Sequence, residues 1–110
     1  MKITRKDNYS ILKYDTDDIP GFATYLTKHH ADFEDNNVIV DVLNHGNLEA
    51  KELLMFLEIS NLHRANKKSF VIASNPVAVE KLPEDIIIAP TLREAEDIIN
   101  MEELERELGF

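Results

Sequence analysis

The sequence predicts an α/β fold: a mixed β-sheet with an N-terminal edge hairpin and about four helices packed on it. Three continuous apolar runs, over residues 38–43, 69–73 and 86–89, are rich in β-branched residues, which is typical of strands covered on both faces. Between and after these runs, apolar residues recur at helical spacing. Because strands alternate with helices, we expect a partly parallel sheet with helices packed against it.

The first part of the chain predicts the hairpin and one helix. Two short strands are expected over residues 2–6 and 9–14, joined by an Asp-Asn turn pair. A helix is expected to begin after the following Asp-Asp pair, because an acidic side chain can cap a helix N-terminus and Pro20 fits the first turn. Its apolar spacing continues to about residue 30.

Three further helices are expected after the first buried strand. One covers residues 48–66, a short one covers 74–82, and the last covers 91–108. A Thr-Leu-Arg-Glu sequence at the start of the last helix has the spacing of a capping box. Gly109 is expected to end that helix, with Phe110 as a terminal apolar contact.

The last predicted helix carries an apolar stripe made of Ile98, Met101, Leu104 and Leu108. Such a stripe packs on the sheet, or it forms an interface with a partner or with a second copy of the chain. The sequence leaves both interpretations open.

Length and composition limit the class of protein. The 110 residues suit one domain over 1–110, with 91–110 as a C-terminal helical segment. Without cysteine there is no disulfide, thiolate zinc site, iron–sulfur cluster or cysteine nucleophile. Apolar runs of about five residues are too short to span a bilayer, and the N-terminus has no signal-peptide core, so a cytoplasmic location is expected.

The net charge of the chain limits the classes of partner that we expect it to bind. The chain has 12 basic and 21 acidic residues, a net charge of −9. We therefore expect neither sequence-independent nucleic-acid binding nor docking on anionic membranes. Residues 79–110 hold ten acidic and three basic residues. This acidic end is interpreted as a solubilising face or as a docking surface for a basic partner.

No residue pattern points to catalysis. The chain lacks a Gly-x-Ser-x-Gly sequence, and Ser74, which follows a predicted strand, is interpreted as a helix cap. A triad of Ser74, His45 and Asp41 would require three side chains that nothing in the sequence holds together. Glu49 and Glu52 are interpreted as acids that favour a helix N-terminus. The chain is therefore not expected to be an enzyme.

Metal and phosphate sites are also not expected. The adjacent His29 and His30 face different sides of a helix, and no His-x-His-x-Asp-His or His-Glu-x-x-His pattern is present. All four histidines, including His45 and His63, are interpreted as surface or partly buried residues. We therefore expect the protein to bind no metal ion and no other cofactor. The turn His45-Gly46-Asn47 supplies free backbone amides for a small anion, or it is a turn glycine followed by Asn47 as helix cap.

The order of elements resembles a known family. The apolar run 38–43, a polar loop, a long amphipathic helix and the strand 69–73 look like a STAS domain (sulfate transporter and anti-sigma factor antagonist), in particular a short, free-standing member of the Bacteroidetes type. The closing stretch 90–110 is the most distinctive part. In this family, a strand leads to a loop with Asp-Ser-Ser-Gly, whose serine is phosphorylated by a partner anti-sigma kinase.

One departure from the family pattern bears on regulation. Glu49-Ala50-Lys51-Glu52 stands where Asp-Ser-Ser-Gly belongs, so Ala50 or Lys51 replaces the phosphorylated serine. The resemblance then implies a non-enzymatic interaction and regulatory module that binds an anti-sigma factor or another regulator without a phosphorylation switch, and a homodimer is a further option. The alternative is a domain that binds a small ligand or nucleotide with the same loops. The expected contact residues are Asn44, His45, Gly46, Asn47, Glu49, Ala50, Lys51, Ser74 and Asn75.

Overall fold

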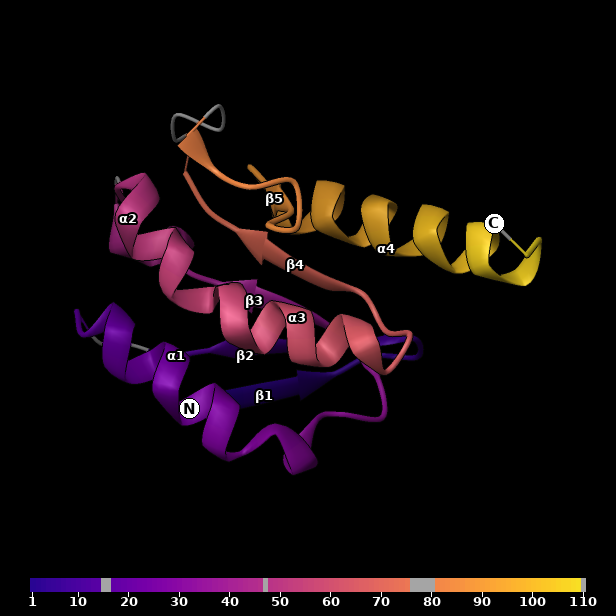
Figure 1. The fold of residues 1–110 in the computed structure, drawn as a ribbon, viewed down its shortest axis with the longest axis horizontal. Helices are drawn as coiled ribbons and strands as arrows, with labels where there is room; N and C mark the ends of the chain where they lie inside the picture. Colours follow the sequence, from indigo (N-terminus) through magenta and orange to yellow (C-terminus); the bar gives the residue numbers. More distant parts are fainter. Residues whose placement is uncertain (15–16, 47, 76–80, 110) are drawn as a thin grey trace.

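A five-stranded mixed sheet forms the centre of the protein, as the sequence predicts for an α/β fold (Figure 1). The structure is a computed structural model that describes residues 1–14, 17–46, 48–75 and 81–109. The strands lie side by side in chain order, β1-β2-β3-β4-β5. They are β1 (Lys2–Arg5), β2 (Tyr9–Lys13), β3 (Asn37–Asp41), β4 (Phe70–Ala73) and β5 (Ile88–Ala89).

The direction of the strands gives the sheet two distinct ends. β1 and β2 form the predicted edge hairpin and run antiparallel. β2, β3, β4 and β5 run parallel to one another, so their carboxyl ends meet at one edge of the sheet. We call this the carboxyl edge, and we call the opposite edge, where these four strands begin, the amino edge.

Helices cover both faces of the sheet. In Figure 1, α1, α2 and α3 lie together on one side of it, and α4 lies apart from them. α2 and α3 are joined by a single 3₁₀ turn, so the predicted long helix exists but begins at Ala50 and is tighter in its middle. The helices are α1 (Ile19–Lys28), α2 (Ala50–Leu53), α3 (Leu57–Ala65) and α4 (Leu92–Glu107).

Two of the predicted helix starts are confirmed, although at Thr91 the Glu94 carboxylate lies against the Thr91 hydroxyl at 3.3 Å, so that among the described residues only half of the predicted capping box is present. The Asp18 carboxylate accepts a hydrogen bond from the Gly21 amide at 2.9 Å, which satisfies a free donor in the first turn of α1. The Thr91 hydroxyl accepts from the Glu94 amide at 3.1 Å and caps α4 in the same way. At its other end α4 stops before Gly109, whose φ of +82° suits glycine.

Two apolar clusters, one on each face, explain why apolar residues follow one another without a break in the middle of β3 and along β4. Side chains that alternate along a strand point to opposite faces, so Val38 and Val40 pack under α1 and α3, whereas Ile39 packs under α4. In β4, Ile72 likewise belongs to the cluster under α1 and α3, and Val71 belongs to the cluster under α4. The larger cluster lies under α1–α3, and the smaller one joins Tyr9, Ile39, Val71, Ala73, Ala89, Ala95 and Ile99.

β5 is shorter than predicted. Ile88 and Ala89 pair with β4, and the Ile87 carbonyl accepts from the Ile72 amide at 2.9 Å, whereas the Ile86 side chain joins the larger cluster. The predicted short helix over 74–82 falls mostly on residues 76–80, which lie outside the described residues. None of the helices in the described ranges has the length and apolar character needed to cross a membrane.

The structure corrects part of one interpretation of α4. Ile98 packs against the smaller cluster as that interpretation expects, but Met101, Leu104 and Leu108 do not pack on the sheet, because 63%, 54% and 62% of their surfaces are exposed. Toward the sheet, the C-terminal half of this helix instead presents Glu102 and Arg106, which bond to groups at the amino edge. The alternative interpretation of this stripe, as an interface, stays a prediction.

Polar groups also attach α4 to the start of β2. The Tyr9 hydroxyl donates to the Glu96 carboxylate, and the Asn8 side-chain amide donates to the Asn100 side-chain oxygen at 2.8 Å. The bond to the Glu96 carboxylate, together with burial, raises the pKa of Tyr9 to about 12. Tyr9 is therefore protonated at neutral pH and acts here as a hydrogen-bond donor.

Candidate interaction surface at the carboxyl edge

The loop after β3 is held in shape by Asn75, the second residue after β4. The Asn75 side-chain amide donates to the Leu43 carbonyl at 3.0 Å and to the Gly46 carbonyl at 2.8 Å. Gly46 has a φ of +71° and a ψ of −142°, a backbone region that is essentially limited to glycine. Asn75 and Gly46, which the sequence placed on two separate loops, are thus brought together in one structure.

The base of this loop is bonded to neighbouring strands. The Asp41 carboxylate is buried and accepts from the Leu43 amide at 3.0 Å, while the Val42 amide donates to the Ala73 carbonyl at 3.0 Å. His45 reaches the end of β2, where its Nε2 lies 3.1 Å from the Tyr14 carbonyl. Since a carbonyl only accepts, Nε2 carries the hydrogen.

These bonds leave the imagined triad unformed. Asp41 bonds to a backbone amide, His45 to a backbone carbonyl, and the Ser74 hydroxyl donates to the Asn75 carbonyl at 3.1 Å. Each side chain therefore has a backbone partner, and no hydrogen bond among the described residues joins any two of the three. Ser74 is fully buried, so it supports the loop from beneath and does not offer its side chain to a partner.

The start of α2 completes the surface. Glu49 precedes the first helical residue, and its backbone amide donates to the Glu52 carboxylate at 3.0 Å. The predicted cap Asn47 lies outside the described residues, and the helix begins three residues beyond it. The exposed Lys51 ammonium lies 3.3 Å from the Glu49 carboxylate. This pairing means that Glu49 does not present an uncompensated negative charge.

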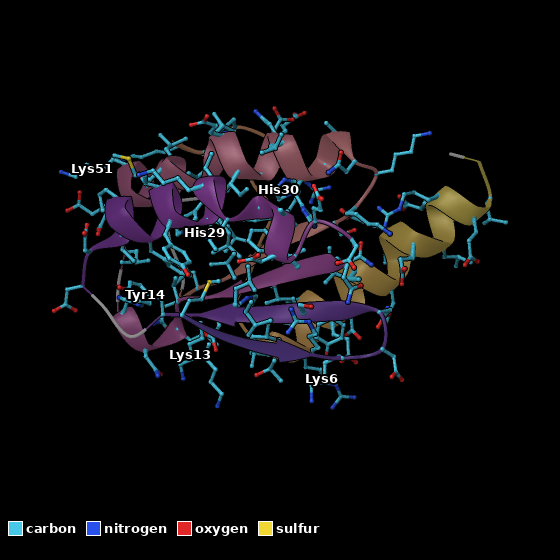
Figure 2. All side chains as sticks on the ribbon, turned by 90° about the horizontal axis from the view of Figure 1, so that it is seen from below. Lys6, Lys13, Tyr14, His29, His30 and Lys51 are labelled. Carbon is cyan, nitrogen blue, oxygen red and sulfur yellow. The ribbon has the colours of Figure 1, made fainter. Side chains whose placement is uncertain are left out.

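Seven of the predicted contact residues thus form one surface, which we call the loop face. It contains residues 44–46, 49–51 and Asn75. Asn44, Gly46, Glu49 and Lys51 are exposed, whereas His45, Ala50 and Asn75 are partly buried. Figure 2 shows Lys51, Tyr14 and Lys13 toward the same end of the molecule. The loop face offers donors, acceptors and charges of both signs.

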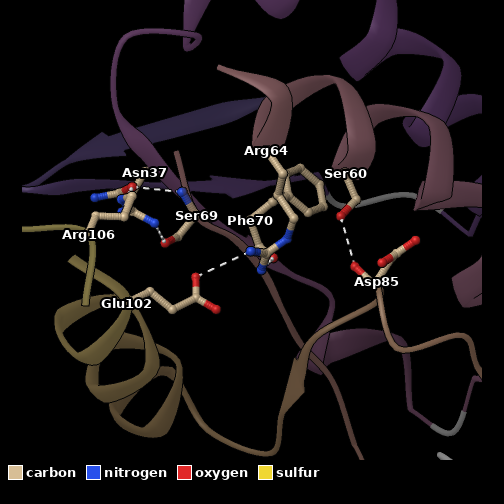
Figure 3. Close-up of polar contacts among 8 residues, drawn as sticks. All are labelled: Asn37, Ser60, Arg64, Ser69, Phe70, Asp85, Glu102 and Arg106. Carbon is tan, nitrogen blue, oxygen red and sulfur yellow. Dashed lines mark hydrogen bonds and ion pairs between the residues drawn. The ribbon is translucent and has the colours of Figure 1, made fainter. Parts of the chain in front are cut away.

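The sequence did not reveal a second polar region, at the amino edge (Figure 3). The Asn37 side-chain oxygen accepts from the Ser69 amide at 2.8 Å and from Arg106 Nη2 at 3.2 Å, and its nitrogen donates to the Asn8 carbonyl at 2.8 Å. Arg106 also donates to the Ser69 hydroxyl at 3.1 Å. The available signal was that Asn37 and Ser69, both polar, directly precede the apolar residues of two central strands.

Arg64 is fixed at the same edge. Its guanidinium donates to the Phe70 carbonyl at 2.9 Å and lies 3.3 Å from the Glu102 carboxylate (Figure 3). Arg64 and Arg106 therefore connect α3, α4 and β4.

Two histidines are more buried than predicted. His30 and His63 bond to each other, with 2.8 Å between His30 Nε2 and His63 Nδ1, and His63 Nε2 lies 2.7 Å from the Asn36 carbonyl. Burial lowers the pKa of His63 to about 4, although the bond to Asn36 opposes this shift. His63 is therefore neutral at pH 7. The interpretation of all four histidines as surface or partly buried is wrong for this pair, because His30 and His63 are both buried. Local sequence spacing does not reveal their contact, since the two residues lie 33 positions apart.

Metal ligation has no support in the parts of the chain that the structure describes, where no three histidine, aspartate or glutamate side chains are placed to hold a metal ion. Comparison with known proteins adds no assignment: no protein-family model matches the chain, and a search of curated proteins finds no match.

Proposed function

We propose that this protein is a non-enzymatic interaction module that binds a regulatory protein through the loop face. The observation that carries the proposal is the pair of hydrogen bonds from Asn75 to Leu43 and Gly46. They hold an exposed polar loop in one shape before any partner arrives. A preformed surface favours binding because less conformational entropy is lost on association.

The state of the polar groups beneath the loop favours binding over catalysis. Asp41, His45 and Ser74 are the groups that a hydrolytic mechanism would use, and each is bonded to backbone. Nucleophilic catalysis requires a nucleophile that is hydrogen-bonded to its base. The loop face is therefore assigned a role in recognition.

The class of partner rests on the resemblance to anti-sigma factor antagonists. We propose a cytoplasmic partner of the anti-sigma factor type or another regulator. Ala50 or Lys51 stands in place of the serine that is phosphorylated in that family, so we propose that the interaction is not switched by phosphorylation there. Control would come from the amounts of the two proteins.

A charge reversal tests the proposal. The tagged chain is used to recover a partner from native lysate, and its affinity for the purified partner is then measured by calorimetry. Glu49→Arg places a second positive charge beside Lys51 and is expected to weaken binding at least tenfold. Glu34→Arg, an exposed acid that precedes β3 at the amino edge, is the matched control and should bind like the wild type. Equal affinities of all three proteins would place the contact surface elsewhere.

A second candidate is self-association through α4, which the exposure of Met101, Leu104 and Leu108 favours. Exposed apolar residues aligned on one helix face are typical of interaction sites. Sedimentation of the wild type and of Leu104→Arg separates the two candidates. A dimer that dissociates in this variant would support self-association, and a monomer in both proteins would remove it.

The third option, a small ligand or nucleotide at the same loops, predicts thermal stabilisation. A ligand at about 100 times its Kd adds about 2.7 kcal/mol to the free energy of unfolding. Thermal melts with a panel of nucleotides and metabolites test this option, and an unchanged melting temperature across the panel would reject it.

A further inference from the structure

The amino edge holds a hollow with an unusual concentration of positive charge. It has a volume of about 440 Å³ and is lined by Arg64, Lys67, Lys68, Arg106 and Gly109. The chain has 12 basic residues against 21 acidic ones, and four of the 12 line this hollow while none of its lining residues is acidic. We call these four side chains the basic pocket.

The fold explains why these residues meet. α3 and α4 both run from the carboxyl edge back to the amino edge, so their C-terminal ends lie beside the start of β4. The Lys67 amide donates to the Arg64 carbonyl at 2.9 Å, and the Gly109 amide donates to the Arg106 carbonyl at 3.2 Å. The basic pocket is thus built from two helix ends and the segment that leads into a central strand.

The two guanidinium groups are held in place by neutral and acidic partners. Arg106 donates to the Ser69 hydroxyl and to the Asn37 side-chain oxygen, both neutral. Arg64 is bonded to the Phe70 carbonyl and paired with Glu102, and its buried Nε has no hydrogen-bond partner in the described part of the chain. Arg64 is thus already paired with a carboxylate, whereas Arg106 is a fixed positive charge whose printed partners are neutral.

The positive charge of the pocket exceeds what is paired locally. Glu102 compensates one of the four cations, and within the described residues neither Lys67 nor Lys68 has an ion-pair or hydrogen-bond partner for its ammonium group. Three of the four positive charges therefore have no ion-pair partner among the described residues.

A purely structural role explains only part of the cluster. Cations near helix C-termini are stabilised by the unpaired carbonyl groups, which accounts for Arg64 and Arg106 in the last turns of α3 and α4. Lys67 follows α3 with a φ of +62° and is the one residue other than glycine with positive φ among those described. This position after a helix usually holds glycine or asparagine. A lysine there sacrifices backbone stability, which is consistent with a use for its charge.

We propose that the basic pocket binds a small phosphorylated metabolite through its phosphate groups. Arg106 supplies a fixed positive charge with neutral partners, and two lysines supply additional charge on flexible stems. A volume of about 440 Å³ holds a molecule of nucleotide or sugar-phosphate size. The exposed Glu105 and Glu107 of α4, close to Arg106 in sequence, oppose a long nucleic-acid backbone. The pocket lies at the opposite edge of the sheet from the loop face, so it is independent of the proposed function.

Inorganic pyrophosphate is the probe for the first test, by calorimetry on the full chain at low and at physiological salt. The wild type is expected to bind it, with an affinity that falls as salt rises. Lys67→Gly is the informative variant, because glycine suits the backbone at this position while the charge is removed. We expect its affinity for pyrophosphate to fall at least tenfold and its melting temperature to rise.

Matched controls separate this site from general charge effects. Lys2→Gln removes an exposed lysine on β1 and should leave the affinity unchanged, whereas Lys68→Gln should lower it several-fold. An equal affinity of wild type and Lys67→Gly, an equal loss in Lys2→Gln, or no binding of pyrophosphate at millimolar concentration would each overturn the proposal. Binding of a hexaglutamate peptide in place of pyrophosphate would also overturn it, because the pocket would then recognise carboxylates of a protein.

Discussion

The two edges of the sheet use polar side chains in different ways. At the carboxyl edge, Asn75, Asp41 and His45 bond to backbone groups of nearby loops and leave a surface of mixed charge exposed. At the amino edge, Asn37 and Arg106 bond to side chains and backbone from several elements at once. The carboxyl edge thus carries a loop that is held in one shape, the feature on which the proposed binding of a protein partner depends. The amino edge is a rigid junction that concentrates positive charge.

The largest expected effect concerns the junction at the amino edge. Asn37→Ala removes the partner of the buried Ser69 amide and of the Arg106 guanidinium. Because buried donors are left unsatisfied, we expect the free energy of unfolding to fall by about 3 kcal/mol. Urea denaturation measures this change. A loss below about 0.5 kcal/mol, the range of ordinary surface substitutions, would mean that the junction does not stabilise the fold.

A second effect tests the buried histidine pair beside this junction. The pKa of His63 is about 4 in the folded chain and about 6.5 when unfolded, so the unfolded state binds more protons between these values. Stability should therefore fall as the pH is lowered, by about 2 kcal/mol between pH 8 and pH 5.

Denaturation of the wild type and of His63→Gln at both pH values isolates this contribution. The variant is expected to lose less stability on acidification than the wild type. The same loss in both proteins would show that His63 is not responsible for the pH dependence.

A smaller effect is expected at the carboxyl edge. Asn75→Ala removes two hydrogen bonds to the loop after β3, but these groups are close to water and can be solvated. We expect the free energy of unfolding to fall by about 1 kcal/mol. We expect the free energy of partner binding to fall by more than this, because the loop would no longer be held in its binding shape. Parallel denaturation and calorimetry check both parts. A stable variant with full affinity would show that the preformed loop is not required.

The smallest expected effect has the opposite sign. Lys67→Gly should raise the free energy of unfolding by about 0.5 kcal/mol, because glycine adopts a positive φ without strain but loses more entropy on folding. Thermal melts compare this variant with Lys68→Gln, whose backbone conformation is ordinary. A destabilised Lys67→Gly would mean that its side chain contributes to the fold and not to an anion site.

The features that the sequence predicted correctly depend on neighbouring residues. Asp18 and Thr91 cap their helices because each acceptor stands three residues before the amide it bonds, and Gly109 ends α4 by its own conformation. Continuous apolar runs predicted β3 and β4, because both strands are covered on two faces. At the carboxyl edge, parallel strands bring their following loops together, so Asn75 and Gly46 could be placed at one site.

What the sequence did not predict depends on long-range contacts. Asn37 and Arg106 are 69 positions apart, and His30 and His63 are 33 positions apart, so no local spacing links them. The exposure of Met101 also follows from contacts between residues that are far apart in the sequence. Because Arg106 and Glu102 are turned toward the amino edge by their bonds, the apolar stripe of α4 is turned toward solvent.

The central claim is that a protein partner binds the loop face. Its most direct test is the change in backbone amide NMR signals of the isotope-labelled chain when the purified partner is added. We predict that the perturbed signals belong to residues 44–46, 49–51 and Asn75, while those of Arg64, Lys67 and Lys68 at the amino edge stay unchanged. Perturbation confined to the amino edge or to the exposed face of α4, with none in the loop face, would contradict the account.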